Sequence, residues 1–236
     1  AIVLGIGLSA LVAGVSAAHY HSDPEIHFSW NPLQRSIRPG SLLAQLAFAV
    51  LGVITVTSEY SSGMIRTSLT AVPKRIRMMS AKLLVFGASA LLVGEVISVA
   101  AFSIGQALIH GKAPSASFGQ HLVLRVVLGA GLYLVLIGLY GSAVALLVRH
   151  AAAGIAIVVG TLFIVPGVVQ LLPSSWVNPI EEYWPAGVVD TNAGPQIFLT
   201  HHNSHALSAW QGLGEFALFV GVVIAVAFYF LERRDA

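Results

Sequence analysis

The sequence contains no cysteine and few charged residues. Without cysteine, the chain cannot form disulfides, hold a metal through thiolates or use a cysteine nucleophile. Only 9% of its 236 residues are Asp, Glu, Lys or Arg, whereas 56% are hydrophobic. A soluble globule needs polar side chains over its surface, but helices that face lipid need none. The composition therefore predicts an integral membrane protein of the all-α class.

The sequence also lacks the motifs of nucleotide hydrolysis and of common hydrolases. Residues 105–113 come nearest to a phosphate-binding loop, but they have one residue too many between the glycines and no Ser or Thr after the lysine. Neither a G-x-S-x-G nor an H-E-x-x-H pattern occurs. We therefore expect that the chain is not an enzyme and binds no nucleotide itself.

Histidines are the remaining candidates for a metal site. His201, His202 and His205 lie close together, and His19 and His21 follow the first apolar run. Two of the first three could share a helix face and reach one ion, but no third ligand is evident nearby. We interpret these histidines as solvated side chains, with a zinc site as the alternative.

Six apolar runs are long enough to cross a bilayer. A hydrocarbon core about 30 Å thick requires roughly 20 mostly apolar helical residues. The runs cover approximately residues 1–18, 41–58, 81–108, 122–148, 151–172 and 209–231. We therefore expect one transmembrane domain, residues 1–236, with six spans. Because the first run starts without Met or a basic lead-in, we also expect residues before Ala1 in the intact chain.

Lys and Arg are divided unequally between the two faces that these spans would create. Eight of the twelve fall after the second span, between the fourth and fifth spans, or in the C-terminal tail, and four fall on the other face. Since cytoplasmic loops carry the excess of positive charge, both termini are expected in the cytoplasm of a multi-pass plasma-membrane protein. All four tryptophans lie in or beside the opposite, external segments, where interfacial indole rings are favoured.

The longest external segment, residues 173–208, is unusually apolar for a loop. Its stretch PSSWVNPIEEYWPAG is dense in aromatic, apolar and proline residues. This pattern favours a re-entrant hairpin that dips into the outer leaflet between neighbouring spans. An ordinary ordered surface loop is the alternative.

Glu95 is the charged residue nearest to the middle of an apolar run. A charge at mid-bilayer costs roughly 3 kcal/mol even on the mildest scales, so its carboxyl group should face the protein interior or a watery cavity. Two roles are open: a structural hydrogen bond between helices, or a place on a substrate path. Small residues at 87–90, 129–131 and 151–154 predict close packing between the spans.

The cytoplasmic segment, residues 59–80, is basic and amphipathic. Its apolar residues recur at steps of three and four along one helical stripe: Ile65, Leu69, Val72, Ile76 and Met79. Pro73 removes a helical donor and disfavours helix in the residue before it, so we expect a short surface helix, an elbow, and a second helix that runs into the third span. A lipid-surface anchor and a docking element for a cytoplasmic partner are both compatible with this pattern.

The start of this segment resembles a known family. In E-Y-S-S-G-M-I-R-T, the residues Glu59, Gly63, Ile65, Arg66 and Thr67 are similar to the E-x-x-x-G-x-I-R segment after the second span of ABC-2 type exporter permeases, especially small actinobacterial ones. The stretch 149–176, the later PAGVVDTNAG and the terminal ERRDA are similar to the same family in order and spacing, so the resemblance covers nearly the whole chain.

What this resemblance implies is the permease subunit of an ATP-driven ABC exporter, which forms half of the translocation pathway. Its partners would be a second permease copy or a paralogue, two separate ABC ATPase subunits that hold ATP and Mg, and membrane lipid, but no nucleic acid. The chain itself would bind no cofactor and no metal. Its substrate would be hydrophobic or amphipathic, such as a drug, peptide or lipid, with multidrug resistance as one such role.

The resemblance also implies that residues 60–72 form a coupling helix that seats in a groove of the ATPase. The coupling residues would be Glu59, Tyr60, Gly63, Met64, Ile65, Arg66, Thr67, Leu69 and Pro73. An ATP-independent secondary transporter or channel is the alternative, but it should show internal repeats and several intramembrane charges, and only Glu95 fits. A lipid-modifying enzyme that uses the external histidines would need a paired carboxylate or a nucleophile motif, and we find neither.

Overall fold

The computed structural model describes residues 2–19, 32–63, 75–119, 121–165, 168, 171–173 and 209–233. Within these ranges all regular secondary structure is helical, which confirms the all-α prediction for this part of the chain. The elements are α1 (Ile2–Ala18), α3 (Pro32–Ser61), α5 (Arg75–Ile109), α6 (His121–Val148), α7 (Ala151–Val159), the π-helical turn η1 (Gly160–Ile164) and α10 (Ala209–Arg233).

Four of these helices are long and apolar enough to cross a membrane, which is the signature of a membrane protein. They are Pro39–Ser61 within α3, Arg75–Ile109, Val123–Val148 within α6, and Trp210–Arg233 within α10. The first and fifth apolar runs are also helical, but Ile6–Ala18 and Ala151–Ile164 are shorter. The external segment expected to form a re-entrant hairpin lies outside the described residues, apart from Pro173.

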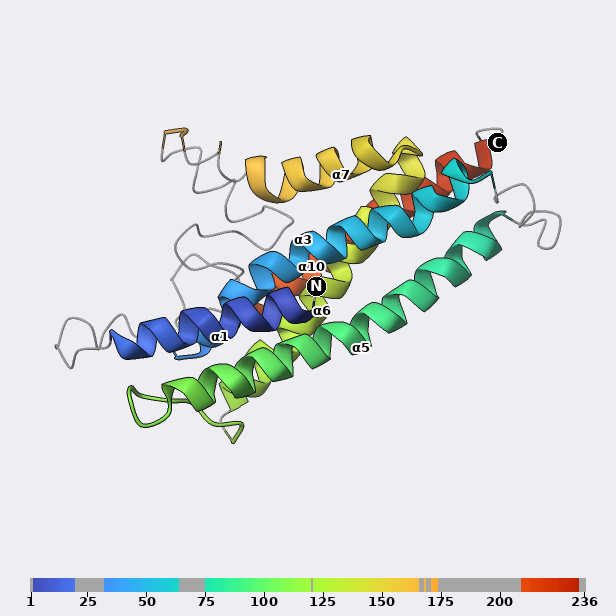
Figure 1. Cartoon of the computed structure of the whole chain (residues 1–236). Helices are drawn as coiled ribbons and strands as arrows, with labels where there is room; N and C mark the ends of the chain where they lie inside the picture. Colours follow the sequence, from blue (N-terminus) through green and yellow to red (C-terminus); the bar gives the residue numbers. More distant parts are fainter. Residues whose placement is uncertain are drawn as a thin grey trace.

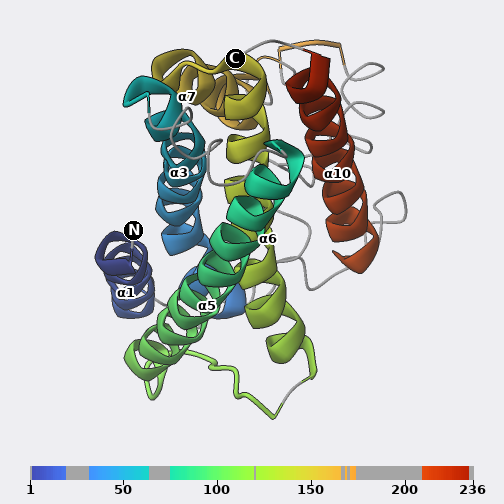
Figure 2. The ribbon, with the colours of Figure 1, turned by 90° about the vertical axis from the view of Figure 1, so that its right-hand side faces the viewer.

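Successive helices run in opposite directions along the bundle (Figure 1). One end therefore gathers the last turn of α3, the first turn of α5, the joint between α6 and α7, and the last turn of α10; we call it the basic end, because Lys82, Arg75, Arg149 and Arg233 lie there. Helix α6 is central: α3 packs on it most extensively, α5 crosses it, and α10 contacts mainly this helix (Figure 2).

Glycines on α3 and α6 allow these two helices to approach closely. A Cβ at Gly52 would overlap the carbonyl oxygen of Gly138, and one at Gly141 would lie 2.5 Å from the carbonyl oxygen of Ala49. The close approach lets the Ser142 hydroxyl donate to the carbonyl oxygen of Gly52 at 3.0 Å. Small residues thus bring the backbones into direct contact, as they do in membrane helix pairs generally.

Buried polar side chains make further bonds between the helices. The Tyr133 hydroxyl of α6 donates to Gln45 Oε1 of α3 at 3.0 Å, and Gln106 Nε2 of α5 donates to Ser36 Oγ of α3 at 2.8 Å. Each such bond is worth roughly 0.6 to 2 kcal/mol where water is excluded. Helix α3 is therefore joined to both α6 and α5 by hydrogen bonds as well as by packing.

Helix bounds differ from the apolar runs at the basic end. Helix α3 continues past the predicted span end at residue 58 to Ser61, and α5 begins at Arg75 and runs unbroken to Ile109. Tyr60 is thus part of α3. The helix predicted after Pro73 runs into the third span as expected, and the two form one element. The reason is that backbone hydrogen bonding continues through the polar residues that flank a span, whereas hydropathy marks only the apolar window.

Candidate functional site

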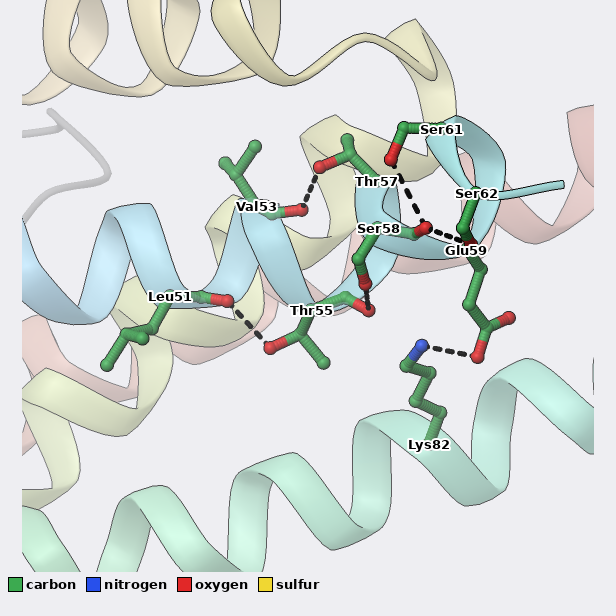
Figure 3. Close-up of polar contacts among 9 residues, drawn as sticks. All are labelled: Leu51, Val53, Thr55, Thr57, Ser58, Glu59, Ser61, Ser62 and Lys82. Carbon is green, nitrogen blue, oxygen red and sulfur yellow. Dashed lines mark hydrogen bonds and ion pairs between the residues drawn. The ribbon is translucent and has the colours of Figure 1, made fainter. Parts of the chain in front are cut away.

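The last turns of α3 carry a run of hydroxyl side chains that bond within the helix (Figure 3). Thr57 Oγ1 donates to the carbonyl oxygen of Val53 at 3.0 Å, and Ser62 Oγ donates to that of Ser58 at 2.6 Å. The same pattern, with a carbonyl three or four residues earlier, holds for Thr55, Ser58 and Ser61. These hydroxyl hydrogens are therefore committed to the backbone.

Gly63 ends α3. The Ser62 amide donates to the carbonyl oxygen of Ser58 at 3.1 Å, and the Gly63 amide donates to that of Tyr60 at 3.4 Å. Gly63 has a φ of +69° and no atom within 4 Å of the position of a Cβ, so its backbone conformation, rather than space, favours glycine here. A left-handed glycine thus sets the direction in which the chain leaves α3 toward residues 64–74.

An ion pair joins the end of α3 to the start of α5. Lys82 Nζ lies 2.5 Å from Glu59 Oε1, and the two side chains are only 24% and 18% exposed (Figure 3). Glu59 Oε2 is buried and has no hydrogen-bond partner among the described residues. Glu59 lies before the segment that connects α3 to α5, and Lys82 lies after it. The ion pair therefore holds the two ends of this connection close together.

Tyr60 lies against the joint between α6 and α7. The guanidinium carbon of Arg149 lies 5.4 Å from the centroid of the Tyr60 ring, within range of a cation–π interaction. Arg149 has a φ of 58°, which is rare for a residue with a Cβ and costs roughly 1 to 2 kcal/mol. His150 then caps α7, where its ring nitrogen Nδ1 accepts from the Ala153 amide at 3.4 Å. The end of α3 thus contacts both α5 and the sharp turn into α7.

Reversing the charge at Glu59 or at Lys82 is expected to destabilise the protein. Glu59→Lys or Lys82→Glu would place like charges together in a partly buried site, at a cost of about 1 to 2 kcal/mol. The doubly reversed variant should recover most of that loss. Thermal unfolding in detergent, followed by circular dichroism, measures both effects. Arg77→Glu, an exposed reversal on α5, is the control, and equal melting of all four variants would contradict the pairing.

The structure describes three of the predicted coupling residues, Glu59, Tyr60 and Gly63, and places them together at the end of α3. The others lie outside the described residues: Met64, Ile65, Arg66, Thr67, Leu69 and Pro73. Lys82 and Arg149 were predicted only to face the cytoplasm, and their contacts with Glu59 and Tyr60 come from the packing of separate helices.

Glu95 lies apart from this cluster. It follows Lys82 by thirteen positions on α5, which corresponds to roughly 20 Å along the helix axis. His201, His202, His205 and His21 lie outside the described residues, within which no group of three or more His, Asp or Glu side chains could hold a metal ion.

Comparison of this chain with protein-family models, with curated proteins and with solved structures gives no match. By its fold and its site, the chain is a helical membrane protein in which polar contacts at the basic end join α3 to α5 and to the turn between α6 and α7.

Proposed function

We propose that the chain is the permease subunit of an ATP-driven exporter of the ABC-2 type, with six transmembrane helices and both termini on the cytoplasmic side of the plasma membrane. The observation that carries this proposal is the position of the E-x-x-x-G-x-I-R segment. Its glutamate lies in the last turn of α3, its glycine ends that helix, and its remainder enters the connection to α5 at the basic end.

In this proposal, residues 60–72 seat against a separate ATPase subunit. Closure of the ATPase dimer displaces the segment, and the helices at its two ends transmit the displacement. The Glu59–Lys82 ion pair transfers it to α3 and α5 together, and the contact of Tyr60 with Arg149 transfers it to the joint before α7. The pathway between two permease subunits then changes from inward or lateral access to outward release.

Two ATPase subunits would hold ATP and Mg in this assembly, and this chain would supply the membrane pathway. Its apolar helices suit a hydrophobic or amphipathic substrate such as a drug, peptide or lipid. A second copy or a paralogue of the chain would complete the pathway.

Isolation of the chain from its native membrane in mild detergent tests the proposal. We expect an ABC ATPase to copurify in equal amount, and vesicles that contain both proteins to accumulate substrate only with ATP. A matched preparation with a Gly63→Pro chain should contain less ATPase. A chain that transports substrate in vesicles with no ATPase present would overturn the proposal and favour a secondary transporter.

A further inference from the structure

Glu95 is an isolated ionisable residue in the middle of the bundle. Helix α5 has no other charged residue between Lys82 and Ile109, α6 has none between Arg125 and its end, and α3 has none between Arg38 and Glu59. No cationic side chain is therefore at hand on these helices to neutralise its carboxylate at this depth. An ionisable residue at mid-bilayer is rare and is by default a candidate functional site.

Two glycines leave room for the carboxyl group of Glu95 between α5 and α6. A Cβ at Gly131 would overlap Cδ and Oε1 of Glu95 and would lie 2.9 Å from Oε2. A Cβ at Gly94 would lie 3.1 Å from the carbonyl oxygen of Gly131. The carboxyl group therefore rests directly on the α6 backbone, at a place where only glycine leaves room for it.

Among the described residues, Glu95 makes no hydrogen bond between helices, which was one of its two expected roles. Its Oε2 atom is buried and has no hydrogen-bond partner among the described residues. The nearby hydroxyl of Ser98, one turn along α5, donates instead to the carbonyl oxygen of Val127 at 2.7 Å. Within the described helices, Glu95 thus keeps its capacity to accept hydrogen bonds.

The rest of Glu95 is partly exposed, and its neighbours on α5 are apolar and open to the outside of the bundle. Leu92, Val96 and Val99 are 72%, 57% and 42% exposed. A ligand whose charged group reached the carboxylate would lay its apolar part on these side chains. The combination of one anionic acceptor and an apolar surface is complementary to an amphipathic cation and repels an anion.

We propose that Glu95, seated on Gly131 and bordered by the exposed apolar residues of α5, binds lipophilic amines in their protonated form. The ammonium group donates to the carboxylate in a charge-assisted hydrogen bond, and the hydrocarbon part packs on Leu92, Val96 and Val99. This inference names a substrate class, so it rests on the proposed export function for its biological meaning, but the binding itself needs no ATPase.

Binding of a dansyl-labelled alkylamine to the purified full chain in phosphatidylcholine nanodiscs tests the site. We expect the amine to bind about tenfold more tightly than its neutral N-acetylated counterpart, because only the amine forms the ion pair. Glu95→Gln should weaken amine binding about tenfold and leave the neutral probe unchanged. The matched control is Glu215→Gln, which removes an exposed carboxylate from α10 and should change neither affinity.

A second variant tests the seat of the carboxyl group. Gly131→Ala puts a methyl group where the Glu95 carboxyl group lies and should also weaken amine binding, whereas Gly221→Ala, with no atom within 4 Å of its Cβ position, should not. Equal amine affinity of Glu95→Gln and the parent chain would overturn the proposal. Equal binding of the amine and the neutral probe to the parent chain would overturn it as well, even if a variant failed to fold.

The experiment separates this proposal from the proposed function. Amine binding that depends on Glu95, in a chain from which no ATPase copurifies, would support the site and overturn the exporter. An ATPase partner together with charge-independent probe binding would support the exporter and overturn the site.

Discussion

Replacing Gly52 by alanine is expected to destabilise the protein by about 3 kcal/mol, or roughly 10 °C in melting temperature. The added methyl group would overlap the carbonyl oxygen of Gly138, which is backbone and cannot rotate away. Helices α3 and α6 would have to separate at their closest contact, and the bond from the Ser142 hydroxyl to Gly52 would lengthen. Because the chain has no cysteine for thiol-reactive dyes, heating in detergent followed by size-exclusion chromatography is the suitable measurement.

The control for this prediction is Gly221→Ala on α10. Its Cβ would meet no atom within 4 Å, so the substitution should leave the melting temperature unchanged or raise it slightly, as alanine favours helix over glycine. If Gly52→Ala melted together with Gly221→Ala, the close contact between α3 and α6 would be wrong.

Under the proposed export function, Gly63→Pro is expected to lower ATP-driven transport strongly while the protein still inserts and folds. Proline fixes φ near −65°, whereas Gly63 has a φ of +69°, and proline also lacks the amide that donates to the carbonyl oxygen of Tyr60. The chain would leave α3 in another direction, and residues 64–74 would be misplaced against the proposed ATPase partner. Transport and permease-stimulated ATPase activity in reconstituted vesicles should both fall at least about tenfold, equivalent to 1.4 kcal/mol in coupling.

Two further variants sharpen the test of Gly63. Gly63→Ala costs only the left-handed conformation, roughly 1 to 2 kcal/mol, and should lower coupling less than proline does. Arg66→Glu reverses a charge within the proposed coupling helix and should weaken ATPase docking without affecting insertion. Normal ATPase stimulation with both Gly63→Pro and Arg66→Glu would count decisively against the coupling role.

The helices of the bundle could be predicted because apolar runs of about 20 residues have few alternatives in a membrane. Their ends could not. Hydropathy places the second span at residues 41–58, but α3 begins at Pro32 and ends at Ser61, since polar residues extend a helix as readily as apolar ones. The left-handed Gly63 gives the actual end of that helix.

The candidate site was predictable only in part. Glu59, Tyr60 and Gly63 follow from the resemblance of one short segment, but their contacts with Lys82 and Arg149 depend on how separate helices pack. The small residues at 129–131 predicted close packing between helices, and Gly131 does lie against α5. The close contact of Gly52 with Gly138 was not predicted from the sequence. The face that each glycine presents to a neighbour is a property of the bundle and not of local sequence.

The polar contacts between α5 and α3 have a mechanical consequence. Its 35 residues extend roughly 52 Å, well beyond a hydrocarbon core of about 30 Å. Near one end of α5, Lys82 forms an ion pair with Glu59, and near the other end Gln106 donates a hydrogen bond to Ser36. Both of these ties connect α5 to the same helix, α3. Sliding α5 along α3 by one turn, about 5.4 Å, would break both ties at once. The two helices therefore form a stiff frame, and a push at the connection between them should tilt the frame as one lever rather than shear it.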